Sequence, residues 1–141
     1  MCVDFHFYKI ESFQFDHTIC KEWIGKVIRN FDYEPGEVII IFTSDEYLLN
    51  LNKQFLNHHY YTDIITFNYN ESDKIAGELY ISVPRVNDNA NMFNTSFQRE
   101  LFRVIIHGVF HLIGYDDQNL EQRKIMRKKE DEALTLLDQI N

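Results

Sequence analysis

The alternation of apolar and polar side chains divides the first part of the chain into a strand, a helix and a second strand. Residues 3–8 alternate between the two kinds, which is typical of a strand with one buried face. Apolar residues at helical spacing follow over about 17–30, with Asp16 available as the N-cap. After a turn predicted at the Pro-Gly pair 35–36, the β-branched run 37–42 (EVIIIF) indicates a strand buried on both faces.

The middle of the chain predicts a helix followed by a β-hairpin. Thr43 and Glu46 form a capping-box signature for a helix that runs to about residue 55. Two strands, 64–68 and 77–83, come next with a short polar loop between them, so we expect them to pair antiparallel.

Three further helices complete the predicted order. Pro84 suits the first turn of a short helix, and Thr95 with Gln98 caps a long one. The last helix covers about 118–139. The order β-α-β-α-β-β-α-α-α predicts one α+β domain over residues 1–141, with a mixed four-stranded sheet packed by about five helices.

Composition and charge narrow the class of protein. With 141 residues and 45% apolar side chains, the chain fits one domain with a substantial core. It contains no signal-peptide core and no apolar stretch of the roughly 20 residues that a membrane span needs. Its two cysteines predict no disulfide framework, so we expect a cytoplasmic protein. We also expect no membrane partner and no organic cofactor. The net charge of −8 disfavours sequence-blind binding to nucleic acid but allows a local basic patch.

The long helix carries one line of polar residues on an otherwise apolar surface. Steps of three and four residues place this line on a single face, and it consists of Glu100, Arg103, His107 and His111. Two imidazoles at i and i+4 can converge on one ion, which is why helical zinc sites use this spacing. Burying ionisable groups without a purpose is costly, so the line favours a metal site.

The chain beyond this helix offers a third metal ligand. Gly114 predicts the helix end, and a short turn then delivers Asp116 and Asp117. A carboxylate there completes a three-ligand site with an open fourth position, as in catalytic zinc sites. Two plainer interpretations stay open: the histidines are hydrogen-bonded core residues, or the two aspartates are N-caps of the last helix.

Four stretches of the chain resemble the YbeY family. Residues 107–117 (HGVFHLIGYDD) are similar to the family signature HGxLHLxGYDH. The pair 51–52 (LN), the run 62–67 (TDIITF, similar to TDVLSF) and the run 77–82 (GELYIS, similar to GDIxIS) fit in the same order. The similarity covers about residues 37–132.

This resemblance implies a function, a cofactor and partners. Family members are single-strand-specific, metal-dependent endoribonucleases that mature ribosomal RNA. The resemblance therefore implies a YbeY-like metallohydrolase with a zincin-like metal helix. Its implied substrate is single-stranded RNA, preferentially ribosomal RNA. It further implies contact with the small ribosomal subunit and a part in ribosome quality control. The implied cofactor is one Zn²⁺ ion held by His107, His111 and Asp117.

Two residues depart from the family pattern. Asp117 stands where the family has a histidine, so the site gains a negative charge and also suits Mn²⁺ or Fe²⁺. The charge makes the ion a weaker Lewis acid. Leu56 stands where the family usually has an arginine, and a leucine binds no phosphate. The basic residues that can substitute are Arg103 on the metal helix and Lys53, Arg85, His58 and His59 elsewhere.

The expected chemistry is metal-assisted hydrolysis of a phosphodiester, with Arg103 as the candidate catalytic cation. The RNA's own 2′-hydroxyl is an alternative nucleophile. Glu100 is a candidate general base, unless it only pairs with Arg103.

Two rival functions stay open. Zinc proteases share the His-x-x-x-His helix, but Gly108 stands where they carry a catalytic glutamate. A non-catalytic ribosome-assembly factor with a structural metal fits Leu56 but not an open coordination position. A basic run on the last helix either contacts RNA or a partner or is a solvated face; it comprises Arg123, Lys124, Arg127, Lys128 and Lys129.

Overall fold

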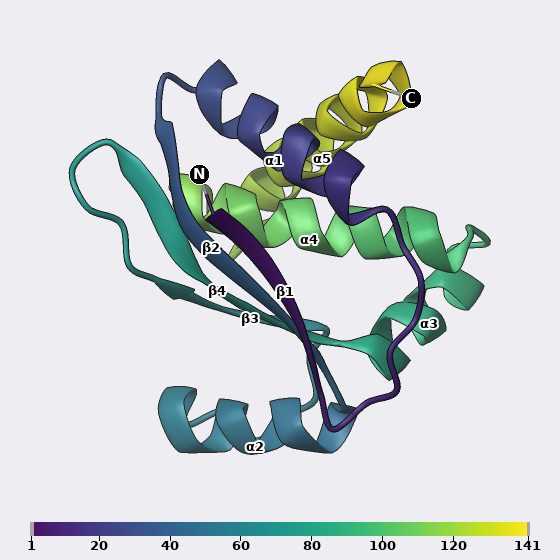
Figure 1. Ribbon diagram of the computed structural model, residues 1–141. Coiled ribbons are helices and arrows are strands. Elements are labelled where there is room, and N and C mark those ends of the chain that lie inside the picture. The colour runs from purple at the N-terminus through teal and green to yellow at the C-terminus, as the bar shows by residue number, and fades with distance from the viewer. Residues whose placement is uncertain (1, 141) are drawn as a thin grey trace.

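The computed structural model of the protein describes residues 2–140 (Figure 1). The strands are β1 (Cys2–Tyr8), β2 (Glu34–Thr43), β3 (Ile64–Asn68) and β4 (Lys74–Ser82), and the helices are α1 (His17–Asn30), α2 (Asp45–Leu56), α3 (Val83–Met92), α4 (Phe97–Ile113) and α5 (Leu120–Ile140). This order confirms the predicted α+β class, with four strands and five helices among the described residues. None of the described helices is long and apolar enough to cross a membrane.

The four strands form one mixed sheet in the order β1-β2-β4-β3. Strands β1, β2 and β4 run parallel, and β3 pairs antiparallel with β4, with Ile64 opposite Ile81 and Asn68 opposite Gly77. The predicted hairpin is therefore confirmed, although β4 begins earlier than expected because Lys74 and Ile75 also pair with Glu34 and Pro35 of β2.

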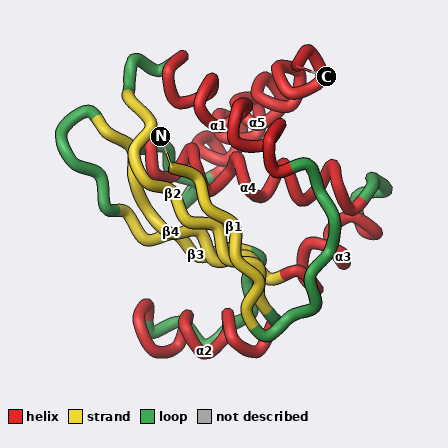
Figure 2. The backbone as a smooth tube through the Cα atoms, viewed as in Figure 1, coloured by secondary structure: helices red, strands yellow, loops and turns green. Residues whose placement is uncertain are grey.

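Helices cover the sheet unequally on its two faces. Helices α1, α4 and α5 lie on one face and α2 lies on the other (Figures 1 and 2). The main core lies between the sheet and α4, where Phe42 and Leu79 pack with Ile105 and Phe110, all of them almost fully buried. A smaller hydrophobic cluster around Leu48 packs α2 against β3 and β4. Helix α4 thus runs through the middle of the fold, as its nearly continuous apolar surface indicates.

Gly108 lets α4 lie close to the sheet. A Cβ atom at this position would lie 2.7 Å from Ile64 Cδ1 and 3.0 Å from Leu79 Cδ2. Packing therefore disfavours a side chain after His107, because a residue larger than glycine would have to displace the methyl ends of Ile64 and Leu79.

Three local predictions are wrong, and in the first two the pairing of β2 with β4 overrides a local signal. Residues 35–36 form no turn but a bulge within β2, where the pairing with β4 shifts register. Thr43 is the last residue of β2, so Ser44 caps α2 by accepting a hydrogen bond from the Tyr47 amide at 3.1 Å. Helix α4 is capped in the same way by Ser96 instead of Thr95.

Candidate metal centre

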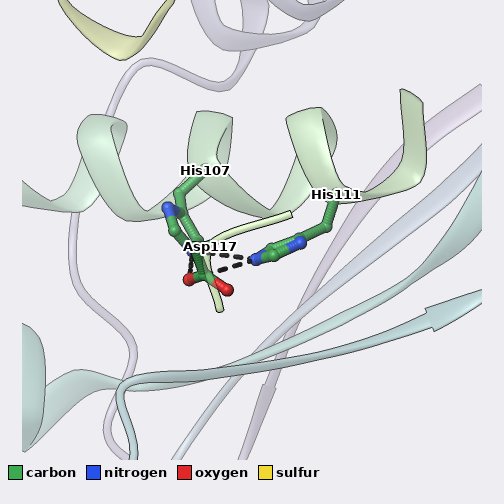
Figure 3. A group of neighbouring side chains, drawn as sticks. All are labelled: His107, His111 and Asp117. Carbon is green, nitrogen blue, oxygen red and sulfur yellow. Dashed lines mark hydrogen bonds and ion pairs between the residues drawn. The ribbon is translucent and has the colours of Figure 1, made fainter. Parts of the chain in front are cut away.

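His107 and His111 lie one turn apart on α4 and point toward Asp117, in the segment that follows the helix (Figure 3). The two Nε2 atoms are 3.0 Å apart. Asp117 Oδ2 lies 3.2 Å from His107 Nε2 and 3.5 Å from His111 Nε2. One ligand atom from each residue falls within 4.8 Å of the others, so the three side chains could hold a metal ion. The structure therefore brings together all three residues that the sequence singles out as ligands.

The end of α4 delivers Asp117 to the histidines. Gly114 takes a φ of +125°, and its amide donates hydrogen bonds to the Phe110 and His111 carbonyls. The chain then turns back toward the helix face. Asn119, through its side-chain oxygen, caps α5 by accepting from the Gln122 amide at 2.8 Å, so the interpretation of Asp116 and Asp117 as N-caps is wrong.

Glu130 on α5 fixes the orientation of His107. The Nδ1–H group of His107 donates to Glu130 Oε2 at 2.7 Å. The other oxygen of Glu130 accepts from Arg103 Nη1 at 2.9 Å, and Arg103 Nη2 donates to Asp131 Oδ1 at 2.6 Å. A carboxylate on Nδ1 sets the tautomer, so the lone pair on Nε2 faces Asp117. This is the arrangement of a metal-ligating histidine with its carboxylate partner.

The atoms that converge at the centre suit a cation, because Asp117 offers a carboxylate oxygen and each neutral imidazole can present a lone pair. With Nδ1 of His107 donating to Glu130, its neutral Nε2 carries a lone pair directed at a carboxylate oxygen 3.2 Å away. Two acceptors at that separation repel each other unless a proton or a cation lies between them. Burial by itself disfavours the charged imidazole, but the Glu130 and Asp117 carboxylates outweigh it and raise the pKa of His107.

Asp63 is a further ionisable group beside the centre. It lies just before β3, and its side chain accepts a hydrogen bond from Asn89 Nδ2 at 3.1 Å. Burial raises the pKa of Asp63, and the nearby His107 and the bond from Asn89 only partly oppose this. Sequence reasoning assigned no role to Asp63 or Glu130. The available signal for Glu130 was its place at helical spacing on the buried face of α5, with Met126 and Ala133.

Two cavities flank the centre and share the lining residues Asp63, His107 and Asp117. The larger one, about 550 Å³, reaches along α5 and is also lined by Glu100 and Arg103. The smaller one, about 300 Å³, lies toward the segment between α2 and β3. The candidate ligands thus stand where two hollows meet.

Leu56 lines the smaller cavity, and the described residues around that cavity include no arginine or lysine. Of the candidate replacements for the family arginine, His58 lines this cavity and Arg103 lines the larger one. Arg85 forms an ion pair with Asp45 at 3.0 Å instead. Lys53 and His59 line neither cavity.

Glu100 lies buried on the wall of the larger cavity, with 4% of its surface exposed. Burial is the main cause that raises the pKa of Glu100, against the opposing charge of Arg103. The alternative pairing of Glu100 with Arg103 is not found among the described ion pairs, because the guanidinium instead bridges Glu130 and Asp131.

The fold and the centre together define a single-domain α+β protein whose central helix supplies two imidazoles to a group of three donors that could hold a metal ion. A carboxylate completes that group, and two adjoining cavities leave it accessible. Two imidazoles and a carboxylate are a donor set that divalent metal sites in proteins use.

Comparison with known proteins identifies the family. A family model described as Endoribonuclease YbeY matches residues 7–138. The Endoribonuclease YbeY of Parabacteroides distasonis is 46% identical over 115 residues, which cover 82% of this chain and 81% of the relative. That of Flavobacterium psychrophilum is 43% identical over 129 residues, 92% of each chain. The solution structure of TM1509 from Thermotoga maritima is similar with a TM-score of 0.66 and 27% identity, covering 96% of this chain and 88% of that one. The chain belongs to the YbeY family.

Proposed function

We propose that this protein is a metal-dependent endoribonuclease that cuts single-stranded RNA during the processing and maturation of ribosomal RNA. The observation that carries the proposal is the convergence of His107, His111 and Asp117 where two cavities meet. The relatives are named endoribonucleases, which supports RNA as the substrate.

One Zn²⁺ ion is the cofactor that this donor set fits, with Mn²⁺ or Fe²⁺ as other divalent metals that two histidines and a carboxylate accept. When bound, the ion supplies Lewis acidity that activates water and offsets charge on a phosphoryl oxygen. His107 and His111 offer Nε2, and Asp117 offers Oδ2. Glu130 holds the His107 ring so that Nε2 faces inward.

Glu100 and Arg103 act on the reaction from the larger cavity. A buried carboxyl with a raised pKa exchanges protons closer to neutral pH than an exposed one, which supports Glu100 as the proton-transferring group. Arg103 lines the same cavity, but two carboxylates already neutralise its charge. The main contribution of Arg103 is to hold Glu130 against His107. Binding of a substrate phosphate is its secondary role.

The biological setting follows from membership of the family. Ribosomal RNA as the substrate, the small ribosomal subunit as the partner and a part in ribosome quality control are the setting we propose. Ribosomal RNA is cytoplasmic in bacteria such as those of the relatives, which supports a cytoplasmic location for the activity.

The decisive experiment is metal analysis of the purified protein beside His111→Ala and Asp117→Ala, with cleavage of single-stranded RNA followed in the same samples. We expect the wild type to retain a divalent metal and to cut RNA, and each variant to lose both. Full metal occupancy in Asp117→Ala would remove Asp117 from the ligand set. Metal-loaded wild type that never cuts RNA would overturn the nuclease proposal.

A second candidate function is favoured by one observation, the apolar Leu56 in the smaller cavity. A protein without a phosphate-binding cation there is suited to a non-catalytic role in ribosome assembly, with a structural metal. Metal-loaded protein that binds small-subunit RNA without cutting it would support this function.

A further inference from the structure

An exposed aromatic ring stands on the wall of the larger cavity. Phe93, the C-cap residue of α3, lines this cavity and is 53% exposed. It takes part in none of the aromatic pairs found among residues 2–140, and the Arg127 guanidinium carbon lies 5.9 Å from its ring centroid. An exposed ring flanked by a guanidinium is the arrangement on which proteins stack unpaired nucleobases.

The basic run of α5 divides into residues that face this cavity and residues that do not. Arg123, Lys124 and Arg127 line the cavity, whereas Lys128 and Lys129 do not. Lys129 instead lies over the Phe31 ring, 5.6 Å from its centroid. The cavity-facing members therefore form a second layer of positive charge beside the metal centre.

These cations are available to a ligand. Within the described part of the chain, neither Arg123 nor Lys124 has a carboxylate within 4.0 Å, and Arg127 has only Glu130 at 3.7 Å. Arg123 Nη1 donates to the Asp117 backbone carbonyl in a long contact of 3.5 Å, so its charge lies directly beside a candidate metal ligand. Arg103, by contrast, is neutralised by two carboxylates.

We propose that the larger cavity contains a nucleotide-binding subsite for single-stranded RNA. An unpaired base stacks on Phe93 beside Arg127, and the neighbouring phosphates bind Arg123 and Lys124. Because Leu56 leaves the smaller cavity without an arginine or lysine among its described lining residues, the larger cavity is the side on which basic side chains bind the RNA phosphates. The choice of RNA as the ligand rests on the proposed function. Base stacking tolerates any sequence, so the subsite selects unpaired strands and not particular bases.

The stacking part is tested by the binding of a fluorescently labelled single-stranded oligoribonucleotide, followed by anisotropy in EDTA so that no cleavage occurs. We expect Phe93→Leu to weaken binding roughly tenfold, within the range for one base stacked on an aromatic ring. Phe93→Trp should retain binding. Phe55→Leu is the matched control, because Phe55 is 59% exposed but lines neither cavity. Equal binding by Phe93→Leu and Phe55→Leu would overturn the stacking role.

The phosphate part is tested by the salt dependence of the same binding. Lys124→Gln should lower the slope of log K against log salt by about 0.7, the value for one phosphate contact on a single strand. Lys128→Gln removes the same charge one turn further along α5, outside the cavity, and should leave the slope unchanged. Identical slopes for the two variants would show a general charge effect and overturn the subsite.

The proposed function and the subsite fail in different ways. Wild type that binds through Phe93 and Lys124 but never cuts RNA when metal-loaded retains the subsite and overturns the nuclease. Wild type that cuts RNA, while its two cavity variants bind like their controls, retains the nuclease and overturns the subsite. Protein that neither binds nor cuts single-stranded RNA overturns both.

Discussion

Glu130 and His107 are joined by a 2.7 Å hydrogen bond between α5 and α4, and the Glu130 side chain is only 6% exposed. The bond links the candidate metal centre to the helix that carries the basic residues of the larger cavity. A carboxylate that orients a ligating histidine contributes to metal affinity without touching the metal.

Loss of that carboxylate should weaken metal binding. We expect Glu130→Gln to reduce metal affinity by about 10- to 100-fold, the usual effect of removing such a partner. Competition with a coloured chelator measures the affinity, and Glu132→Gln, two residues along the same helix on an exposed position, is the control. Unchanged affinity in Glu130→Gln would show that Glu130 serves only the ion pair with Arg103.

Glu100 should make the stability of the fold depend on pH. Its pKa is raised in the folded state, so the folded protein binds this proton more tightly than the unfolded chain does. The stabilising effect of the proton is complete below the ordinary glutamate pKa of about 4.3 and is lost as pH rises through the raised value.

Replacement of Glu100 by glutamine should remove the decrease in fold stability that accompanies ionisation of this carboxyl. In urea denaturation, Glu100→Gln should therefore gain stability over wild type as pH rises from about 4.3 toward neutrality. Parallel pH profiles for the two proteins would contradict the raised pKa.

Adding even a methyl group at Gly108 should destabilise the fold. Alanine normally stabilises a helix interior by about 1 kcal/mol over glycine, whereas overpacking a core costs about 1–3 kcal/mol. Since the new Cβ would lie 2.7 Å from Ile64 Cδ1, we expect Gly108→Ala to lower the free energy of unfolding by about 1 kcal/mol net.

A second substitution isolates the cause of that loss. Ile64→Val removes the Cδ1 atom, so stability should recover in the double variant relative to the sum of the two single changes. Gly108→Ala protein that is more stable than wild type would show that the sheet relaxes away from the helix.

Replacing Thr43 with valine should stabilise the fold. Its hydroxyl Oγ1 is buried and has no hydrogen-bond partner among the described residues. Replacing it with a methyl group removes an unsatisfied polar atom at nearly constant volume, so Thr43→Val should raise the free energy of unfolding by about 1 kcal/mol. Thr43→Ala also removes the hydroxyl but loses side-chain volume, so it should lower the free energy of unfolding. Chemical denaturation of both variants separates the effect of the hydroxyl from the effect of the lost volume. A less stable Thr43→Val would indicate that the hydroxyl is bonded in solution.

The parts of the site that the sequence predicts are those set by local geometry. The helical period alone places His107 and His111 on one face, and Gly114 stops the helix so that Asp117 can return to it. Glu130 lies 23 residues from His107 on another helix, and no local pattern encodes how α5 packs on α4. The same limit explains the cap of α2, because the pairing of β2 with β4 extends through Thr43 and moves the cap one residue along.

The pair of cavities on either side of Asp63, His107 and Asp117 also decides where along a polymer the protein can act. An enzyme whose active site is a closed pocket cuts at the end of a strand, because only a chain end can enter the pocket. Such an enzyme releases single nucleotides. A centre with room on both sides accepts the middle of a strand, so neither a free 5′ nor a free 3′ end is needed. Circular RNA without ends should then be opened as readily as linear RNA of the same sequence.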